Sequence, residues 1–204
     1  MRIAILVEGR TETAFKSHLV AFLKARLAGQ MPRLDMSPYD GRIPKGEKLR
    51  RTVEMLLLPT KKTPAADAVI ALTDVYTGTN DFLDADDAKQ KMSTWVESNP
   101  RFYPHVAKHD FEAWLLPYWS DIQKLAGHNR KPPSGLPESV NHTRPPSYHI
   151  KEIFEIGTCR DSYSKPRDAN RILQDNDLAL AVAQCPELKS FVNRIIELSG
   201  GEPL

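Results

Sequence analysis

Two short apolar runs limit what this chain can fold into more than any other feature of its sequence. Ile3 to Val7 and Ala68 to Leu72 are continuous apolar stretches of strand length. A strand that is apolar on both faces is typical of a parallel sheet that helices cover on both sides. We therefore expect an α/β fold with a mostly parallel central sheet and flanking helices.

Segments with helical periodicity alternate with these strands. Five apolar residues after the first run recur at intervals of three and four, and so share one face of a helix. They are Phe15, Leu19, Phe22, Leu23 and Leu27. Further helices are expected at about 47–58 and 84–96, and further strands at about 34–36 and 102–107. Strands that alternate with helices imply right-handed crossovers in a parallel sheet.

The character of the sequence changes after Asp110, beyond which no further strand is expected. The segment from Lys131 to Pro146 holds five prolines, which excludes a regular helix there. Residues 148–198 favour short helices separated by Pro166 and Pro186. The sequence therefore predicts a single domain over 1–204, with an α/β core at about 1–120 and a helical C-terminal appendage at about 121–204.

Composition excludes several classes of protein. No apolar stretch approaches the roughly 20 residues of a membrane-spanning helix, and Cys159 and Cys185 lack the spacing of zinc ligands. We expect a cytoplasmic protein with no membrane partner. The formal net charge of +2 on 204 residues does not by itself indicate a nucleic-acid partner, so such a role depends on where the charges lie.

Acidic residues follow three of the expected strands. Glu8 follows the first strand, Asp74 follows the run ending at Leu72, and Asp110 and Glu112 follow the strand at 102–107. The carboxyl ends of parallel strands meet at one edge of a sheet, so these carboxylates are expected to converge. Such a cluster suits Mg²⁺, which activates water and neutralises phosphodiester charge. Each acid taken singly also fits a helix cap or a surface ion pair, and Asp110 is the better cap by residue type.

The residues around these acids resemble a known family. The chain is similar to an uncharacterised bacterial family, known only as a domain of unknown function, with the Toprim-like fold that topoisomerases, primases and some nucleases share. The matching segments are Val7-Glu8-Gly9-Arg10-Thr11-Glu12, Leu72-Thr73-Asp74-Val75-Tyr76, Arg101-Phe102-Tyr103-Pro104, His109-Asp110-Phe111-Glu112-Ala113-Trp114-Leu115-Leu116, Pro137-Glu138-Ser139-Val140-Asn141, Pro146-Ser147, Tyr163-Ser164-Lys165 and Cys185-Pro186.

The resemblance assigns roles to the first two acids. Glu8 matches the glutamate of the first Toprim strand, a general acid or base, and Asp74 matches the first aspartate of an Asp-x-Asp pair. Tyr76 stands where the second aspartate is expected. Glu112 is therefore our candidate for the missing oxygen ligand, with Asp81 as the weaker choice. The expected cofactor is Mg²⁺ or Mn²⁺.

The resemblance implies a metal-dependent enzyme that cleaves phosphodiester bonds, a nuclease, working with an ATPase partner in bacterial defence or repair. The alternative is a non-catalytic module that binds nucleic acid or a partner ATPase and keeps the fold without competent metal ligands. The loss of the second aspartate favours this alternative.

Basic residues supply the candidate contacts to nucleic acid. The segment from Gly41 to Lys48 lacks the Gly-Lys-Ser/Thr ending of a nucleotide-binding loop. Its cations and those just after it are candidates to hold a phosphate backbone, with a solvated basic loop as the alternative. These candidates are Arg42, Lys45, Lys48 and Arg51, beside Arg50, and Lys165 is a further one. His109 is a candidate to contact phosphate or move a proton, or else a structural histidine.

Overall fold

The central element is a four-stranded sheet in which all neighbouring strands are parallel, in the order β2-β1-β3-β4. The computed structural model describes residues 1–39, 41–75, 81–140, 143–160 and 162–204. The strands are β1 (Arg2–Val7), β2 (Arg33–Pro38), β3 (Ala68–Asp74) and β4 (Phe102–Ala107). This arrangement confirms the expected α/β fold class.

The two apolar runs form the centre of the sheet. In β1, Ile3 and Ile5 belong to one apolar core, whereas Ala4 and Leu6 belong to a second core on the other face. Both faces are buried, which explains why the run does not alternate with polar residues. The edge strand β2 is more polar and includes Asp35, so its sequence signal was weaker than that of β1 or β3.

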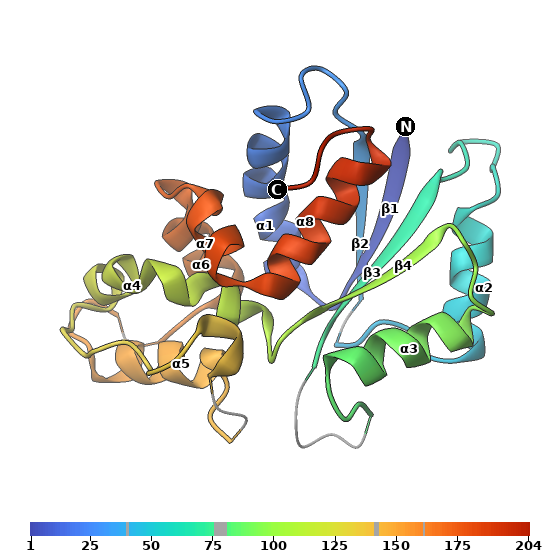
Figure 1. Ribbon diagram of the computed structural model, residues 1–204. Coiled ribbons are helices and arrows are strands. Elements are labelled where there is room, and N and C mark those ends of the chain that lie inside the picture. The colour runs from blue at the N-terminus through green and yellow to red at the C-terminus, as the bar shows by residue number, and fades with distance from the viewer. Residues whose placement is uncertain (40, 76–80, 141–142, 161) are drawn as a thin grey trace.

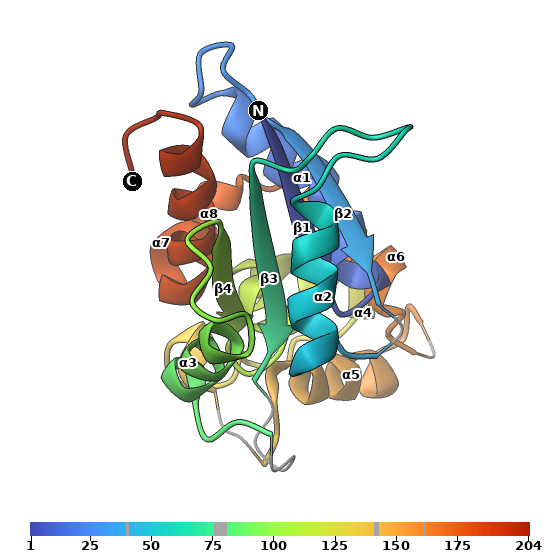
Figure 2. The ribbon, with the colours of Figure 1, turned by 90° about the vertical axis from the view of Figure 1, so that its right-hand side faces the viewer.

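Helices cover both faces of the sheet. Figure 1 shows α1 and α8 on one side and α2 and α3 on the other, and Figure 2 looks onto the side of α2 and α3. These helices are α1 (Arg10–Lys24), α2 (Glu47–Leu56), α3 (Ala85–Trp95) and α8 (Pro186–Leu198). The sequence predicted α1, α2 and α3, and each predicted helix extended slightly beyond the C-terminal end of the observed one.

The remaining described elements after β4 are helical. They are the 3₁₀ helices η1 (Phe111–Tyr118) and η2 (Pro137–Ser139), and α4 (Trp119–Ala126), α5 (Pro146–Ile156), α6 (Lys165–Gln174) and α7 (Leu178–Gln184). Pro146, Pro166 and Pro186 lie at the starts of α5, α6 and α8, where the missing N–H costs no helical hydrogen bond.

The C-terminal helices share a core with the sheet and bring new residues to its carboxyl end. Phe191 and Ile195 of α8 lie in the same apolar core as Ile5 and Ile70. Helix α6 packs along α1, and α4 and α5 lie beside the lower, carboxyl ends of the strands in Figure 1. None of the described helices has the length and apolar character needed to cross a bilayer.

Candidate functional site

A cavity of about 410 Å³ opens where the carboxyl ends of β1 and β3 meet the starts of α1, η1 and α6. The described residues that line it are Glu8, Gly9, Thr11, Glu12, Gly41, Arg42, Asp74, Phe111, Glu112, Lys165 and Pro166. Three of the predicted acids, Glu8, Asp74 and Glu112, therefore share one cavity with two of the predicted cations, Arg42 and Lys165.

Glu8 follows β1 directly and is almost fully buried. Its Oε1 accepts a hydrogen bond from the Thr73 hydroxyl of the neighbouring strand β3. Burial raises the pKa of Glu8 to about 7, although the Thr73 hydrogen bond and the charge of Arg42 act in the opposite direction. A carboxyl group with that pKa exchanges protons readily near neutral pH.

Asp74, the last residue of β3, is partly buried. Burial raises its pKa well above the ordinary value, and the negative charges of Glu8, Asp110, Glu12 and Glu112 raise it further. Four other carboxylates thus lie close enough to repel charge on Asp74, which identifies this residue as the electrostatic centre of the acidic cluster.

Asp110 lies at the start of η1 and is fully buried. It occupies the N-cap position of η1, as its residue type and position suggested, but its side chain makes no capping hydrogen bond to that helix. Instead, Asp110 Oδ2 accepts a 3.1 Å hydrogen bond from the backbone N–H of Ser147 in α5. Burial, with repulsion from Glu112 next in size, raises the pKa of Asp110 to about 7.

Glu112 is also fully buried and has two partners from one distant segment of the chain. Lys165 Nζ lies 3.0 Å from Glu112 Oε2, and the Tyr163 hydroxyl donates to Oε1 at 3.4 Å. Burial alone lowers the pKa of Lys165, but the carboxylates, with Glu112 first, outweigh burial and raise it. Lys165 is therefore a fixed cation on the cavity wall.

Glu12 lines the cavity but was not among the predicted site residues. It is 5% exposed, and burial followed by repulsion from Glu112 raises its pKa. Its position three residues after Gly9, at the start of α1, is that of an ordinary first-turn glutamate that satisfies backbone N–H groups. The available signal was its place in the segment from Glu8 to Glu12, immediately after the first strand.

The donor set suits a hard divalent cation, because its side chains offer only carboxylate oxygens and their mutual repulsion favours a cation among them. Among the described residues, however, no three His, Cys, Asp or Glu side chains lie together at metal-holding spacing. Tyr76, at the position of the second Toprim aspartate, lies outside the described residues. The metal roles of Glu8, Asp74 and Glu112 thus stay predictions.

Two further predicted site residues do not line the cavity as the structure describes it. His109 is 2% exposed, beneath the surface. Asp81 pairs with Arg42 and with Lys45, whose Nζ lies 2.6 Å from Asp81 Oδ1. The catalytic role of His109 and the reserve metal role of Asp81 remain untested predictions.

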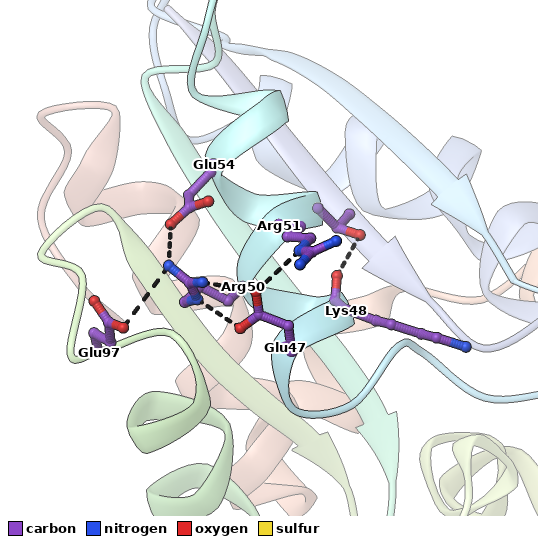
Figure 3. Close-up of polar contacts among 7 residues, drawn as sticks. Glu47, Lys48, Arg50, Arg51, Glu54 and Glu97 are labelled. Carbon is purple, nitrogen blue, oxygen red and sulfur yellow. Dashed lines mark hydrogen bonds and ion pairs between the residues drawn. The ribbon is translucent and has the colours of Figure 1, made fainter.

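Most of the basic side chains in residues 42–51, around α2, form ion pairs with carboxylates. Figure 3 shows Arg50 and Arg51 directed at Glu47, with Arg50 also facing Glu54 and Glu97, while the Lys48 side chain extends away from this group. Much of the charge that suggested a nucleic-acid contact is therefore balanced locally.

The fold and the cavity together define a Toprim-like α/β protein with an acidic site at the carboxyl end of its sheet. The sequence pattern described as "Domain of unknown function (DUF4276)" matches residues 7–196, so the chain belongs to that family. This match confirms the resemblance seen in the sequence. No curated protein matches the chain.

Solved structures with a similar fold include C-terminal regions of OLD proteins. The region from Burkholderia pseudomallei matches with a TM-score of 0.50 and 13% identity, over 97% of this chain and 98% of that chain. The region from Xanthomonas campestris pv. campestris gives a TM-score of 0.48 and 15% identity, over 98% of this chain and 96% of that chain. At such identities the likeness concerns the fold alone, and the first match agrees with the expected architecture.

Proposed function

We propose that this protein is a Mg²⁺- or Mn²⁺-dependent nuclease, an enzyme that cleaves phosphodiester bonds. The observation that carries the proposal is the convergence of Glu8, Glu12, Asp74 and Glu112 in one cavity at the carboxyl end of a parallel sheet. This edge is where open α/β sheets place their ligands.

The residues proposed to hold the metal are Glu8, Asp74 and Glu112, with Asp81 in reserve. When bound, the ion would neutralise charge on the phosphodiester and activate water. Lys165 and Arg42 on the cavity wall would attract the phosphate and hold it near the acids.

Glu8 is the proposed proton-transfer residue. The Thr73 hydroxyl donates a hydrogen bond to its Oε1 and so orients the carboxyl group, which lines the cavity. With a pKa of about 7, the Glu8 carboxyl group can both accept and release a proton near neutral pH.

We further propose that 1–204 act as one domain, in which the helical region at about 121–204 supplies Lys165 to the site of the α/β core. An ATPase partner, a cytoplasmic location and a role in bacterial defence or repair are proposed from the family resemblance alone.

The test is a cleavage assay with labelled DNA, RNA and transfer RNA, in Mg²⁺ or Mn²⁺ and in EDTA. We expect metal-dependent cleavage that Glu8→Gln and Asp74→Asn abolish. The matched control is Glu155→Gln, which neutralises an exposed carboxylate on α5 and should keep full activity. Absence of cleavage of every substrate in both metals would reject the enzymatic proposal.

A second candidate function is a non-catalytic module that binds nucleic acid or a partner ATPase. The spacing of the acids favours this candidate. No three acidic side chains of the described residues lie close enough to hold a metal together, and Lys165 already pairs with Glu112. Nucleic-acid binding that is unchanged by Glu8→Gln, without cleavage, would support this candidate.

A further inference from the structure

Three arginines converge on one buried carboxylate beside the cavity. Asp168 in the first turn of α6 is fully buried, and it accepts a 2.7 Å hydrogen bond from the backbone N–H of Ser164. Arg167 Nε lies 2.9 Å from Asp168 Oδ1, Arg160 Nη1 lies 3.6 Å from it, and Arg171 Nη1 lies 3.7 Å from it.

One guanidinium already satisfies this carboxylate. Arg167 binds it through two nitrogens, Nε to Oδ1 and Nη2 to Oδ2, each at 2.9 Å. A bidentate pair of this kind neutralises a carboxylate. Among the described residues, the ion pairs of Arg160 and Arg171 also end on Asp168 alone, so the cluster carries surplus positive charge.

The surplus charge faces solvent. The side chains of Arg160, Arg167 and Arg171 are 27%, 48% and 39% exposed, while that of Asp168 is 0% exposed. The carboxylate thus anchors the guanidinium groups from below and leaves their outer edges available to another anion. We call these three residues the arginine patch.

The basic segment around α2 has a smaller surplus of positive charge for its number of cations. Four of its five cations pair with four carboxylates, as Figure 3 shows for the part around Arg50. The paired cations are Arg42, Lys45, Arg50 and Arg51, the carboxylates are Glu47, Glu54, Asp81 and Glu97, and the Lys48 side chain extends away from them. In the arginine patch, three cations share one carboxylate.

The arginine patch adjoins the acidic cavity. Lys165 and Pro166 line the cavity, and Arg167 follows them in the first turn of α6. A nucleic acid with one phosphate near Lys165 would therefore place neighbouring phosphates close to the first turn of α6, which carries Arg167. Several cations placed together outside a catalytic cavity suit a ligand with regularly spaced phosphates, such as the backbone of a nucleic acid.

We propose that Arg160, Arg167 and Arg171 form a binding surface for the phosphate backbone of a nucleic acid whose scissile bond lies in the acidic cavity. The inference rests on the proposed function for the placement of the scissile bond, but the binding surface itself does not require cleavage. The proposal assigns the principal contact with the nucleic-acid backbone to Arg167 and Arg171 of α6, together with Arg160, which lies before that helix.

The test is binding of a fluorescein-labelled RNA and of a DNA duplex of the same sequence, in EDTA, over a range of salt concentrations. The variant is Arg160→Gln/Arg171→Gln, which keeps the two hydrogen bonds between Arg167 and Asp168. Loss of two phosphate contacts should weaken binding roughly ten- to hundredfold at about 0.1 M salt. It should also flatten the log–log salt dependence by about 1.4 to 1.8 units.

The matched control is Lys61→Gln/Lys62→Gln, which removes the same charge from the exposed loop before β3, at the amino end of that strand and away from the cavity. This control should bind like the wild type. A charge-preserving variant, Arg160→Lys/Arg171→Lys, should keep most of the salt dependence. If the Gln double variant fails to fold, Arg171→Gln alone should flatten the slope by about one unit.

Wild-type affinity and salt dependence in the folded Gln double variant would overturn the proposal, even if the wild type cleaves nucleic acid. Weakened binding in that variant alone, together with no cleavage by the wild type, would support the binding surface while rejecting the enzymatic function. Binding of the wild type to anionic lipid vesicles but to neither nucleic acid would also overturn the proposal.

Discussion

Lys165 Nζ lies 3.0 Å from Oε2 of Glu112, although 53 positions separate the two residues in the chain. Glu112 is the second residue of η1, the first helix after β4, and Lys165 begins α6, so this ion pair joins the C-terminal helices to the acidic cavity. It also places a cation among carboxylates that repel one another, which lowers their mutual repulsion.

The ion pair should contribute measurably to stability. Lys165→Met leaves the fully buried Glu112 without its cation, and we expect the free energy of unfolding to fall by about 1 to 3 kcal/mol. Adding Glu112→Gln to that variant should restore most of the loss. Urea unfolding of the wild type, both single variants and the double variant measures this coupling.

A surface ion pair provides the control for this cycle. Lys124 and Asp121 lie 2.9 Å apart, but the Lys124 side chain is 76% exposed. Lys124→Met should change stability by less than about 0.5 kcal/mol. An equally small effect of Lys165→Met would show that the ion pair with Glu112 does not hold the C-terminal helices to the cavity.

A divalent cation should stabilise the folded protein. Mg²⁺ or Mn²⁺ at about 100 times its dissociation constant would add about 2.7 kcal/mol, or roughly 5 to 10 °C in melting temperature. Asp74→Asn should remove this shift and melt higher than the wild type in EDTA, because Asp74 is repelled by four neighbouring carboxylates. Equal melting of the wild type in EDTA and in both metals would contradict the metal site.

Stability of the metal-free protein should depend on pH through two buried carboxyl groups. The pKa of Glu8 rises from its ordinary 4.5 to about 7, and that of Asp110 from 3.8 to about 7, chiefly through burial. The folded state therefore holds more protons than the unfolded state between these values. The stabilisation is complete below the ordinary pKa values and is lost as the pH rises through about 7.

Comparison with Glu8→Gln isolates one of these groups. His105 acts in the opposite direction, because burial lowers its pKa from 6.5 to about 3, and the variant keeps His105 unchanged. Between about pH 5 and about pH 8 in EDTA, the unfolding free energy of the wild type should fall relative to the variant. Parallel curves for the two proteins would reject the raised pKa of Glu8.

A buried glutamate outside the cavity should act on stability alone. Glu138 accepts hydrogen bonds from Trp114 Nε1 at 3.1 Å and from the backbone N–H groups of Glu187 and Leu188 at 2.9 and 3.3 Å. It therefore caps the start of α8 from a different element. Glu138→Ala should lower the free energy of unfolding by about 2 to 4 kcal/mol.

The same variant should keep wild-type cleavage per folded molecule, because Glu138 is not among the described residues that line the cavity. Glu155→Ala, on the exposed face of α5, is the matched control and should change stability by less than about 0.5 kcal/mol. Unchanged stability of Glu138→Ala would show that this side chain does not cap α8.

Much of the fold followed from local pattern. The buried runs in β1 and β3 predicted a parallel sheet, because only strands covered on both faces remain apolar at every position. Edge strand β2 was harder to delimit, since its polar Asp35 is satisfied by Arg2 of a neighbouring strand. The convergence of Glu8, Asp74 and Glu112 followed from their positions after successive parallel strands.

Charge clusters in the sequence were less informative than burial patterns. The cations from Arg42 to Arg51 are adjacent in the chain, but Asp81 and Glu97, which balance part of their charge, come from later segments. Conversely, the surplus charge around Asp168 depends on how Arg160 and α6 pack together. Spacing along the chain reports which residues share a helix face, not which distant carboxylate lies opposite them.

The sequence by itself determined the sheet, its flanking helices and the edge at which the acids gather, because hydrophobic periodicity encodes which faces are buried. Only the tertiary structure decided the partners of those acids. Lys165 reaches Glu112, Ser147 reaches Asp110 and Thr73 reaches Glu8 through contacts that join separate elements. Such pairings depend on the packing of whole helices and strands, and it is this packing that sets the charge and the proton affinity of the cavity.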